Sequence, residues 1–180
     1  LSLSGGAGSY GQYMGGLKGS VSGKRWYMSA NLFTQTATNS FAYSDLAGVR
    51  KYMDNGRLQS AAGMLQLAYK ISAGNVISLS AWGQRYEREI PPALFESVSK
   101  KKQTDGSLRL LADWHKASGT NMWYAKSSFI KDDLQYRDEV YLLSTDNTVF
   151  QYFQEVGWRK QLKRHMQFLL FSPVQLAWLN

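Results

Sequence analysis

Apolar and polar residues alternate with a period of two along residues 61–89, which is typical of a β-hairpin with one apolar and one polar face. In the first arm, apolar residues occupy every second position from Leu65 to Ile71. A tight turn is predicted at residues 72–75, after which Ile77 and Leu79 continue the apolar face. Each arm is about ten to fourteen residues long, against five or six in a usual strand. The pattern therefore predicts a sheet with long strands.

The same alternation recurs along the chain and predicts one all-β domain over residues 1–180. Strands are expected at residues 1–5, 12–22, 26–38, in both arms of 61–89, and at 106–117, 121–136, 148–161 and 165–180. The last of these alternates poorly and contains Pro173. Short connections are expected near residues 23–25, 73–75, 118–120 and 162–164, and long ones at 39–59, 90–104 and 137–147.

Connections that alternate between short and long are typical of transmembrane β-barrels, which have short periplasmic turns and longer extracellular loops. The predicted fold is an antiparallel up-and-down transmembrane β-barrel segment of about eight or nine strands. If the chain is a fragment of a larger barrel, the sheet should be open and curved. The 72–75 turn is then periplasmic, and the Arg85–Pro92 exit of the hairpin is extracellular.

A transmembrane barrel inverts the usual core, because its apolar face contacts lipid. We expect Leu65, Leu67, Ile77 and Leu79 to face lipid, and Ser78, Ser80 and Gln84 to face the lumen. Aromatic residues also gather near the predicted strand ends, where Trp and Tyr settle at the headgroup level. They are Trp26, Tyr27, Tyr69, Trp82, Tyr86, Trp114, Trp123, Tyr124 and Trp158.

Composition agrees with a folded all-β chain. Apolar residues make up 44% of the 180 residues, and aromatic residues (11 Tyr, 8 Phe, 6 Trp) outnumber the 3 Pro. The longest apolar run, Phe168–Phe171, is far shorter than the ~20 residues of a transmembrane helix. The chain has no Cys, so thiol chemistry does not enter.

The net charge of +8 raises the question of nucleic-acid binding. The positive residues gather at predicted turns, where charges are usually solvated, so no nucleic-acid partner is expected. They include Lys24, Arg25, Lys116, Arg159, Lys160, Lys163 and Arg164. The two histidines, His115 and His165, lack metal-ligand spacing, and no nucleophile elbow is present. We therefore expect neither a metal centre nor an enzyme.

Four segments resemble TonB-dependent outer-membrane receptors, above all the cobalamin and siderophore receptors. They read GSYGQY from residue 8, NSFAYSD from residue 39, DNGRLQSAAGMLQLAYKIS from residue 54 and AWGQRYEREIPPAL from residue 81. The resemblance implies uptake of a large scarce nutrient, such as cobalamin, an iron–siderophore or haem, across the bacterial outer membrane. It also implies a barrel of about 22 strands around a plug, of which this chain resembles the N-terminal part of the barrel.

The partners implied by the resemblance are outer-membrane lipid, the plug, the remaining barrel strands and, through the plug, the TonB complex. The chain begins at Leu1 without a signal segment, which we interpret as a fragment or a processed product. A partial barrel has two unpaired edges, and unpaired backbone in lipid costs several kcal/mol per group. These strands should therefore not span a membrane alone.

Ligand contacts are expected at the extracellular ends of the strands. The candidate residues are Tyr43, Tyr52, Arg85, Arg88 and Tyr136. Because cobalamin receptors can bind calcium through acidic loop residues, Asp45 and Asp54 are weak calcium candidates. Calcium takes six to eight oxygen ligands, however, and this loop offers few carboxylates. No resident cofactor is expected.

Two other architectures are compatible with the same pattern. The first is a small self-closed eight-stranded barrel that acts as an anchor or adhesin, and the second is a soluble β-sandwich binding module. Pairing of the first strand with the last would support the small barrel, whereas an open curved sheet would support a piece of a larger one. The ending Trp178-Leu179-Asn180 argues against the small barrel, whose last strand commonly ends in an aromatic residue.

Overall fold

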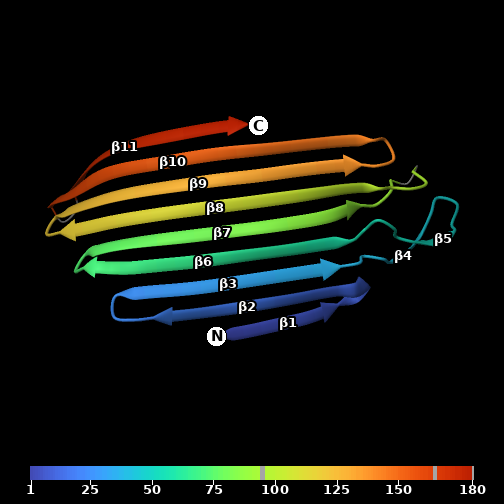
Figure 1. Cartoon of the computed structure of the whole chain (residues 1–180), viewed down its shortest axis with the longest axis horizontal. Coiled ribbons are helices and arrows are strands. Elements are labelled where there is room, and N and C mark those ends of the chain that lie inside the picture. The colour runs from blue at the N-terminus through green and yellow to red at the C-terminus, as the bar shows by residue number, and fades with distance from the viewer. Residues whose placement is uncertain (94–95, 164–165, 180) are drawn as a thin grey trace.

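The computed structural model describes residues 1–93, 96–163 and 166–179. Nine of its strands form one antiparallel sheet in the order β1-β2-β3-β6-β7-β8-β9-β10-β11, and consecutive strands of this order are neighbours (Figure 1). They are β1 (Ser2–Gly8), β2 (Gln12–Ser22), β3 (Trp26–Ala37), β6 (Leu58–Ser72), β7 (Asn75–Ile90), β8 (Lys101–Ser118), β9 (Asn121–Asp138), β10 (Leu143–Lys163) and β11 (Met166–Leu179). The predicted all-β, up-and-down antiparallel fold is confirmed.

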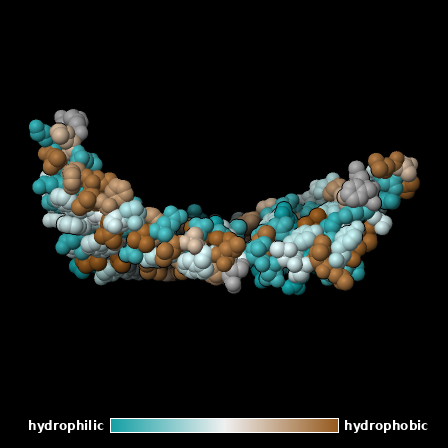
Figure 2. All heavy atoms as spheres, turned by 90° about the horizontal axis from the view of Figure 1, so that it is seen from above, coloured by the Kyte–Doolittle hydropathy of each residue, from teal (hydrophilic) through white to brown (hydrophobic). Residues whose placement is uncertain are grey.

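The sheet is open. β1 and β11 lie at opposite edges, and no strand pair of the described residues joins them (Figure 1). Seen from above, the molecule is a shallow crescent, and the nine-stranded sheet forms a single layer (Figure 2). The self-closed eight-stranded barrel and the two-layered sandwich are therefore wrong as descriptions of the part of the chain that the structure describes. No helix within that part is long and apolar enough to cross a membrane.

Three of the predicted tight turns are present, at residues 23–25, 73–74 and 119–120, and they lie at one end of the sheet (Figure 1). Gly74 and Gly119 take positive φ values of 70° and 58°, which glycine adopts without steric cost. Two long connections, 38–57 and 91–100, lie at the opposite end. The first contains a small hairpin of β4 (Ala42–Ser44) and β5 (Arg50–Tyr52), where the sequence indicated an irregular loop.

The predicted long loop at residues 137–147 is wrong. β9 continues to Asp138 and β10 begins at Leu143, so only residues 139–142 connect them. The Asp138 carboxylate closes this turn, because its Oδ1 accepts hydrogen bonds from the backbone N–H groups of Val140 (3.0 Å) and Tyr141 (3.3 Å). The polar run after the turn resembles a loop in sequence but pairs with the end of β9.

The last strand forms despite its weak alternation. β11 pairs with β10 from Met166 to Leu179, with Glu155 opposite Pro173. Arg164, His165 and Asn180, to which the sequence assigned a turn and strand ends, lie outside the described residues.

Strand register sorts the side chains onto two faces. We call the side that carries Leu65, Leu67, Ile77 and Leu79 the apolar face, and the side that carries Ser78, Ser80 and Gln84 the polar face. Leu67 lies opposite Leu79, and Gln66 lies opposite Ser80, so the faces continue from strand to strand. The predicted division of these residues between two faces is thus present.

The apolar face is the more exposed of the two in β7. Ile77 and Leu79 are 39% and 47% exposed, whereas Ser78 and Ser80 are half-buried. Among the described apolar residues, only Ala37 and Tyr124 are buried. A single layer with its apolar side chains outward has no core of the kind that stabilises a soluble domain.

Candidate functional site

An aromatic row crosses the apolar face beside the tight turns. We call it the turn-side row, and it consists of Trp26, Tyr69, Trp114, Trp123, Trp158 and Phe168. Trp123 and Trp158 stack with their ring centres 5.7 Å apart. Two indole N–H groups bond to asparagines that begin the neighbouring strands: Trp114 Nε1 donates to Asn75 Oδ1 (3.0 Å), and Trp158 Nε1 donates to Asn121 Oδ1 (3.2 Å). Each ring thus combines an apolar body with a satisfied polar tip, as at a membrane interface.

Charged residues lie on the same face toward both ends of the strands. Lys116 and Lys160 lie beside the turn-side row. A larger group lies toward the opposite end. We call this larger group the charged rim, and its described members include Arg85, Glu87, Glu89, Lys102, Lys131, Asp133, Arg137 and Asp146. Between the turn-side row and the charged rim, the described apolar face of β6 to β10 carries no Asp, Glu, Lys or Arg. Next to the rim, Phe150 stacks on Trp178 with their ring centres 5.4 Å apart, and the ring centres of Phe150 and Phe129 lie 6.2 Å apart. The apolar band is therefore bounded on both sides.

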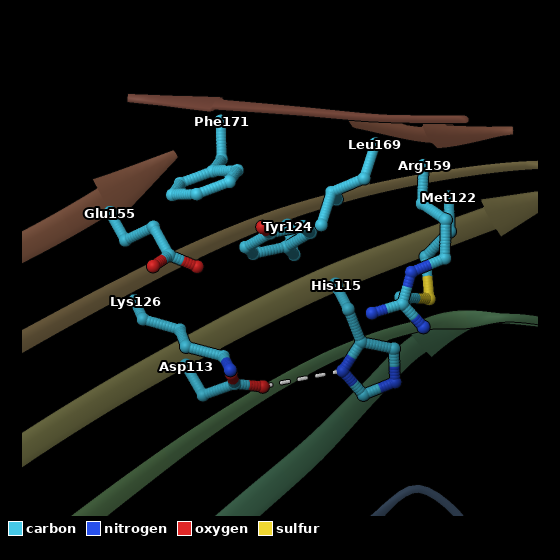
Figure 3. Close-up of a pocket in the computed structure, with 9 residues that line it drawn as sticks. All are labelled: Asp113, His115, Met122, Tyr124, Lys126, Glu155, Arg159, Leu169 and Phe171. Atoms are coloured by element: carbon cyan, nitrogen blue, oxygen red, sulfur yellow. Dashed lines mark hydrogen bonds and ion pairs between the residues drawn. The ribbon is translucent and has the colours of Figure 1, made fainter. Parts of the chain in front are cut away.

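The polar face has a hollow of about 420 Å³ across β8 to β11 (Figure 3). Its lining residues are Asp113, His115, Met122, Tyr124, Lys126, Glu155, Arg159, Leu169 and Phe171. His115 Nδ1 lies 3.3 Å from Asp113 Oδ1, and the Lys126 ammonium lies 5.5 Å from the centre of the Tyr124 ring. Charges of both signs beside an apolar wall suit contact with a solute or segment that carries both kinds of group.

Tyr124 is held against the sheet in this hollow. It is 7% exposed, and its register partner on β10 is Gly157. A Cβ atom built on Gly157 would overlap the Tyr124 ring, so the glycine provides the space that the ring fills. Period-two reasoning placed Tyr124 near a strand end but could not reveal this pairing, since the β9–β10 register depends on the turn at Asp138.

The predicted ligand residues do not all converge. Arg88 Nη2 donates to Gln103 Oε1 (2.8 Å), and Gln103 lies opposite Tyr136, so these three form one row on the polar face. Arg85 lies on the apolar face, where its Nε donates to Glu87 Oε1 (2.8 Å). Gln103 was missed because residues 90–104 were predicted as a long connection, whereas β8 begins at Lys101.

Tyr43 and Tyr52, the other predicted ligand residues, lie on the β4–β5 hairpin. Tyr43 pairs with Lys51, whereas Tyr52 pairs with Ala42. Alternation therefore sends the two tyrosine side chains to opposite sides of the hairpin. Tyr52 is 66% exposed. Their role in ligand binding remains a prediction.

The two calcium candidates shape turns. Asp45 Oδ1 accepts hydrogen bonds from the N–H groups of Ala47 and Val49, both at 2.9 Å, and Asp45 Oδ2 pairs with Lys51 Nζ at 2.9 Å. The hydrogen bond from Lys51, followed by that from Val49, lowers the pKa of Asp45. Asp54 Oδ1 accepts from the N–H of Asn55. Among the described residues, no three His, Cys, Asp or Glu side chains gather as metal ligands would.

Asn55 fastens the first long connection to the second. Its side-chain amide donates to the backbone oxygens of Ile90 (2.8 Å) and Lys101 (3.0 Å), and the hydroxyl of buried Ser99 donates to the same Ile90 oxygen (2.6 Å). Asn55 has a φ of 53°, a conformation that asparagine tolerates better than most residues. The sequence predicted only a long connection over residues 39–59 here.

Local stability of the 91–100 connection should depend on pH. Glu96 pairs with Lys101 and also accepts the N–H of Ala93 (2.9 Å). The hydrogen bond from Lys101 lowers the pKa of Glu96 below 4.5, and the same bond raises the pKa of Lys101 above 10.5. The pair therefore stabilises the connection fully between about pH 4.5 and 10.5 and is lost beyond the shifted values on either side.

Hydrogen exchange of the Ala93 amide measures this effect. We expect the protection factor of this amide to fall as the pH drops below the shifted pKa of Glu96. In Glu96→Gln, the protection factor should be lower at neutral pH and should no longer fall with decreasing pH. A Glu139→Gln variant, in the β9–β10 turn, controls for general acid effects. If the protection factor in Glu96→Gln falls at acid pH by as much as in the wild type, the Glu96–Lys101 pair does not stabilise the connection.

A comparison with protein-family models matches no family, and a comparison with curated proteins finds no match either.

Proposed function

We propose that this chain forms part of the wall of a transmembrane β-barrel in the bacterial outer membrane. The exposure of the apolar face carries the proposal: Ile77 and Leu79 are more exposed than Ser78 and Ser80, which alternate with them, and this is the reverse of a soluble sheet. Covering such a face with lipid removes its apolar side chains from water, which stabilises the protein by about 25 cal/mol for each Å² of apolar surface buried. Outer-membrane barrels have this arrangement of apolar residues outward and polar residues inward.

The dimensions of the apolar band support a membrane span. On β9, the stretch from Trp123 in the turn-side row to Lys131 in the charged rim comprises nine residues, counting both ends. A transmembrane β-strand needs about 9–11 tilted residues. Parts of β8, β9 and β10 continue past the rim, as strands do when they extend beyond the headgroups toward extracellular loops.

The open edges support a larger barrel. Among the described strands, β1 and β11 each have one neighbour, and unpaired backbone groups in lipid cost several kcal/mol each. We infer that further strands complete the wall and that a plug fills the lumen. By its resemblance, the barrel belongs to a TonB-dependent receptor that transports a large scarce nutrient, cobalamin or an iron chelate such as a siderophore or haem, with TonB acting through the plug.

Nutrient binding is assigned to the row of Arg88, Gln103 and Tyr136, on the polar face near the long connections. The test uses the complete polypeptide in detergent, titrated separately with cyanocobalamin, a ferric hydroxamate siderophore and haem. We expect one of them to bind, and Arg88→Ala to weaken that binding by roughly tenfold, because hydrogen bonds to charged groups contribute about 1.5–3 kcal/mol.

The matched control is Lys24→Ala, which removes a positive charge at the opposite, tight-turn end of the sheet. Cell fractionation should also recover the protein with the outer membrane. Binding of none of the three compounds, or equal weakening by Lys24→Ala, would contradict the assignment of nutrient binding. Recovery in a soluble fraction would contradict the barrel itself.

A further inference from the structure

Three polar side chains interrupt the apolar band on β9 and β10. We call them the mid-band cluster, and they are Ser127, Tyr152 and Gln154. Register places all three on the apolar face, with Ser127 opposite Gln154. Ser127 Oγ donates to the Tyr152 hydroxyl (3.3 Å), and this hydroxyl donates to Gln154 Oε1 (2.7 Å). Neither the nutrient-binding row nor the charged rim includes these residues.

The mid-band cluster is far from both borders of the band. On β10, Gln154 is four residues from Trp158 of the turn-side row and four residues from Phe150, which lies opposite Lys131 of the charged rim. A strand rises about 3.3 Å per residue, so either border is about 13 Å along the strand, beyond the reach of a glutamine side chain. In the barrel proposed above, the Gln154 amide therefore lies at the depth of the lipid tails.

The Gln154 amide has hydrogen-bonding capacity that the cluster does not use. A primary amide carries two N–H donors, and its oxygen can accept two hydrogen bonds. Within the described part of the chain, Gln154 Nε2 has no acceptor, and Oε1 accepts only from Tyr152. The side chain is exposed. Lipid tails offer neither donors nor acceptors, so contact with another polypeptide is what would satisfy this amide.

Small side chains around the cluster allow a second surface to come close. Ala112 lies opposite Ser127, and Ala125 and Ser172 belong to the next row toward the tight turns. An apolar hollow of about 350 Å³, with Ala112, Ser127 and Phe129 among its lining residues, adjoins the cluster. Because lipid tails are as apolar as leucine, association within a membrane depends on such close packing and on hydrogen bonds between polar side chains.

We propose that the apolar face of β9 and β10 is the contact surface between two copies of the complete barrel, in which the two Gln154 amides bond to each other. An amide both donates and accepts, so it is complementary to its own copy. In a two-fold dimer, residues near the axis meet their counterparts. Two barrels in one membrane share a two-fold axis along the membrane normal, which brings residues of equal depth together.

Charge does not oppose this contact. Between the turn-side row and the charged rim, the apolar face of β9 and β10 carries no Asp, Glu, Lys or Arg. The proposal rests on the membrane-spanning function proposed above, because the amide is costly to expose only among lipid tails. It adds a second copy of the chain as a lateral partner to a face that otherwise contacts lipid.

Fluorescence energy transfer between donor- and acceptor-labelled copies of the complete polypeptide in vesicles tests this interface. We expect transfer to fall as the protein is diluted in lipid, which gives the dissociation constant of the dimer. Gln154→Leu should raise that constant at least tenfold and leave insertion intact, since leucine suits the lipid face. The matched control is Gln151→Leu, which removes an amide from the polar face of the same strand and should leave the constant unchanged.

Cross-linking locates the contact on the sheet. Any Cys elsewhere in the complete polypeptide is first replaced by Ser, and Gln154→Cys is treated in vesicles with a short bismaleimide, which spans the roughly 10 Å between sheets packed face to face. We expect a covalent dimer. The control is Leu67→Cys, which lies in the same register row but four strands away and should remain monomeric.

Insertion of the wild type and of each variant is checked separately by protease protection. If the inserted wild type shows no energy transfer at any dilution, or if Gln154→Leu associates as tightly as the wild type, the dimer contact is wrong and the barrel stands. Equal cross-linking of Leu67→Cys and Gln154→Cys would also contradict the contact. Failure of the wild type to insert would overturn the proposed function, and with it this interface.

Discussion

Replacing Leu79 by arginine should lower the free energy of unfolding from a bilayer by up to about 2–4 kcal/mol, the cost of a positive charge at the midplane on the lipid face of a barrel. Leu79 is 47% exposed, pairs with Leu67 and Ala112, and lies in the apolar band two residues beyond Ile77, which pairs with Tyr69 and Trp114 of the turn-side row. The loss should appear as a shift of the urea unfolding midpoint of the complete polypeptide in vesicles.

The matched control is Ser80→Arg, one position along on the polar face. Ser80 is half-buried and faces Gln66 and Leu111, so arginine there should reach the polar lumen and cost under 1 kcal/mol. Equal costs for the two variants would remove the distinction between the faces. A larger cost for Ser80→Arg would reverse the orientation of the sheet.

Gly157→Ala should destabilise the sheet by about 1–3 kcal/mol, the usual cost of inserting a methyl group where no space exists. The new Cβ atom would overlap the ring of Tyr124 and force it away from β10. The same substitution in a Tyr124→Ala background should cost close to zero, because the clashing ring is gone. Urea unfolding of the two single variants and the double variant measures this coupling.

Gly83→Ala serves as the control for this pair. A Cβ atom at Gly83 would lie 3.7 Å from the Ser107 oxygen and 3.9 Å from Leu108 Cδ1, both ordinary contacts. Its cost should stay within about 0.5 kcal/mol of zero. If Gly157→Ala costs as much in the Tyr124→Ala background as in the wild type, the contact between ring and glycine is not the cause.

Much of the fold could be predicted from period-two alternation. β2 spans the expected residues 12–22, and the two arms of the hairpin at residues 61–89 pair as expected. Alternation is informative where one face is apolar, and it loses its signal past the charged rim, where both faces are polar. That is why residues 143–147 were predicted as a loop, although their backbone groups pair with β9.

The functional surfaces were only partly predictable. The tryptophans of the turn-side row were expected near strand ends, because each follows or precedes a turn signal. The contacts of Phe129 and Phe150 with their aromatic neighbours depend on the register of β9, β10 and β11, which turn geometry decides. Arg85 and Arg88 were assigned to one ligand site, yet three positions along a strand place them on opposite faces.

A spin-label scan along β7 tests the central claim, that the apolar face meets lipid and the polar face meets water. The chain has no Cys, and any Cys elsewhere in the complete polypeptide is first replaced by Ser, so single cysteines from Val76 to Glu87 can be labelled without background in the membrane-inserted polypeptide. At Ile77, Leu79 and Ala81 we expect collisions with oxygen, which concentrates in lipid, to dominate. At Ser78, Ser80 and Gln84, collisions with a water-soluble nickel chelate should dominate. The claim would be contradicted if collision rates did not alternate from residue to residue, or if oxygen collisions dominated at Ser78, Ser80 and Gln84 instead.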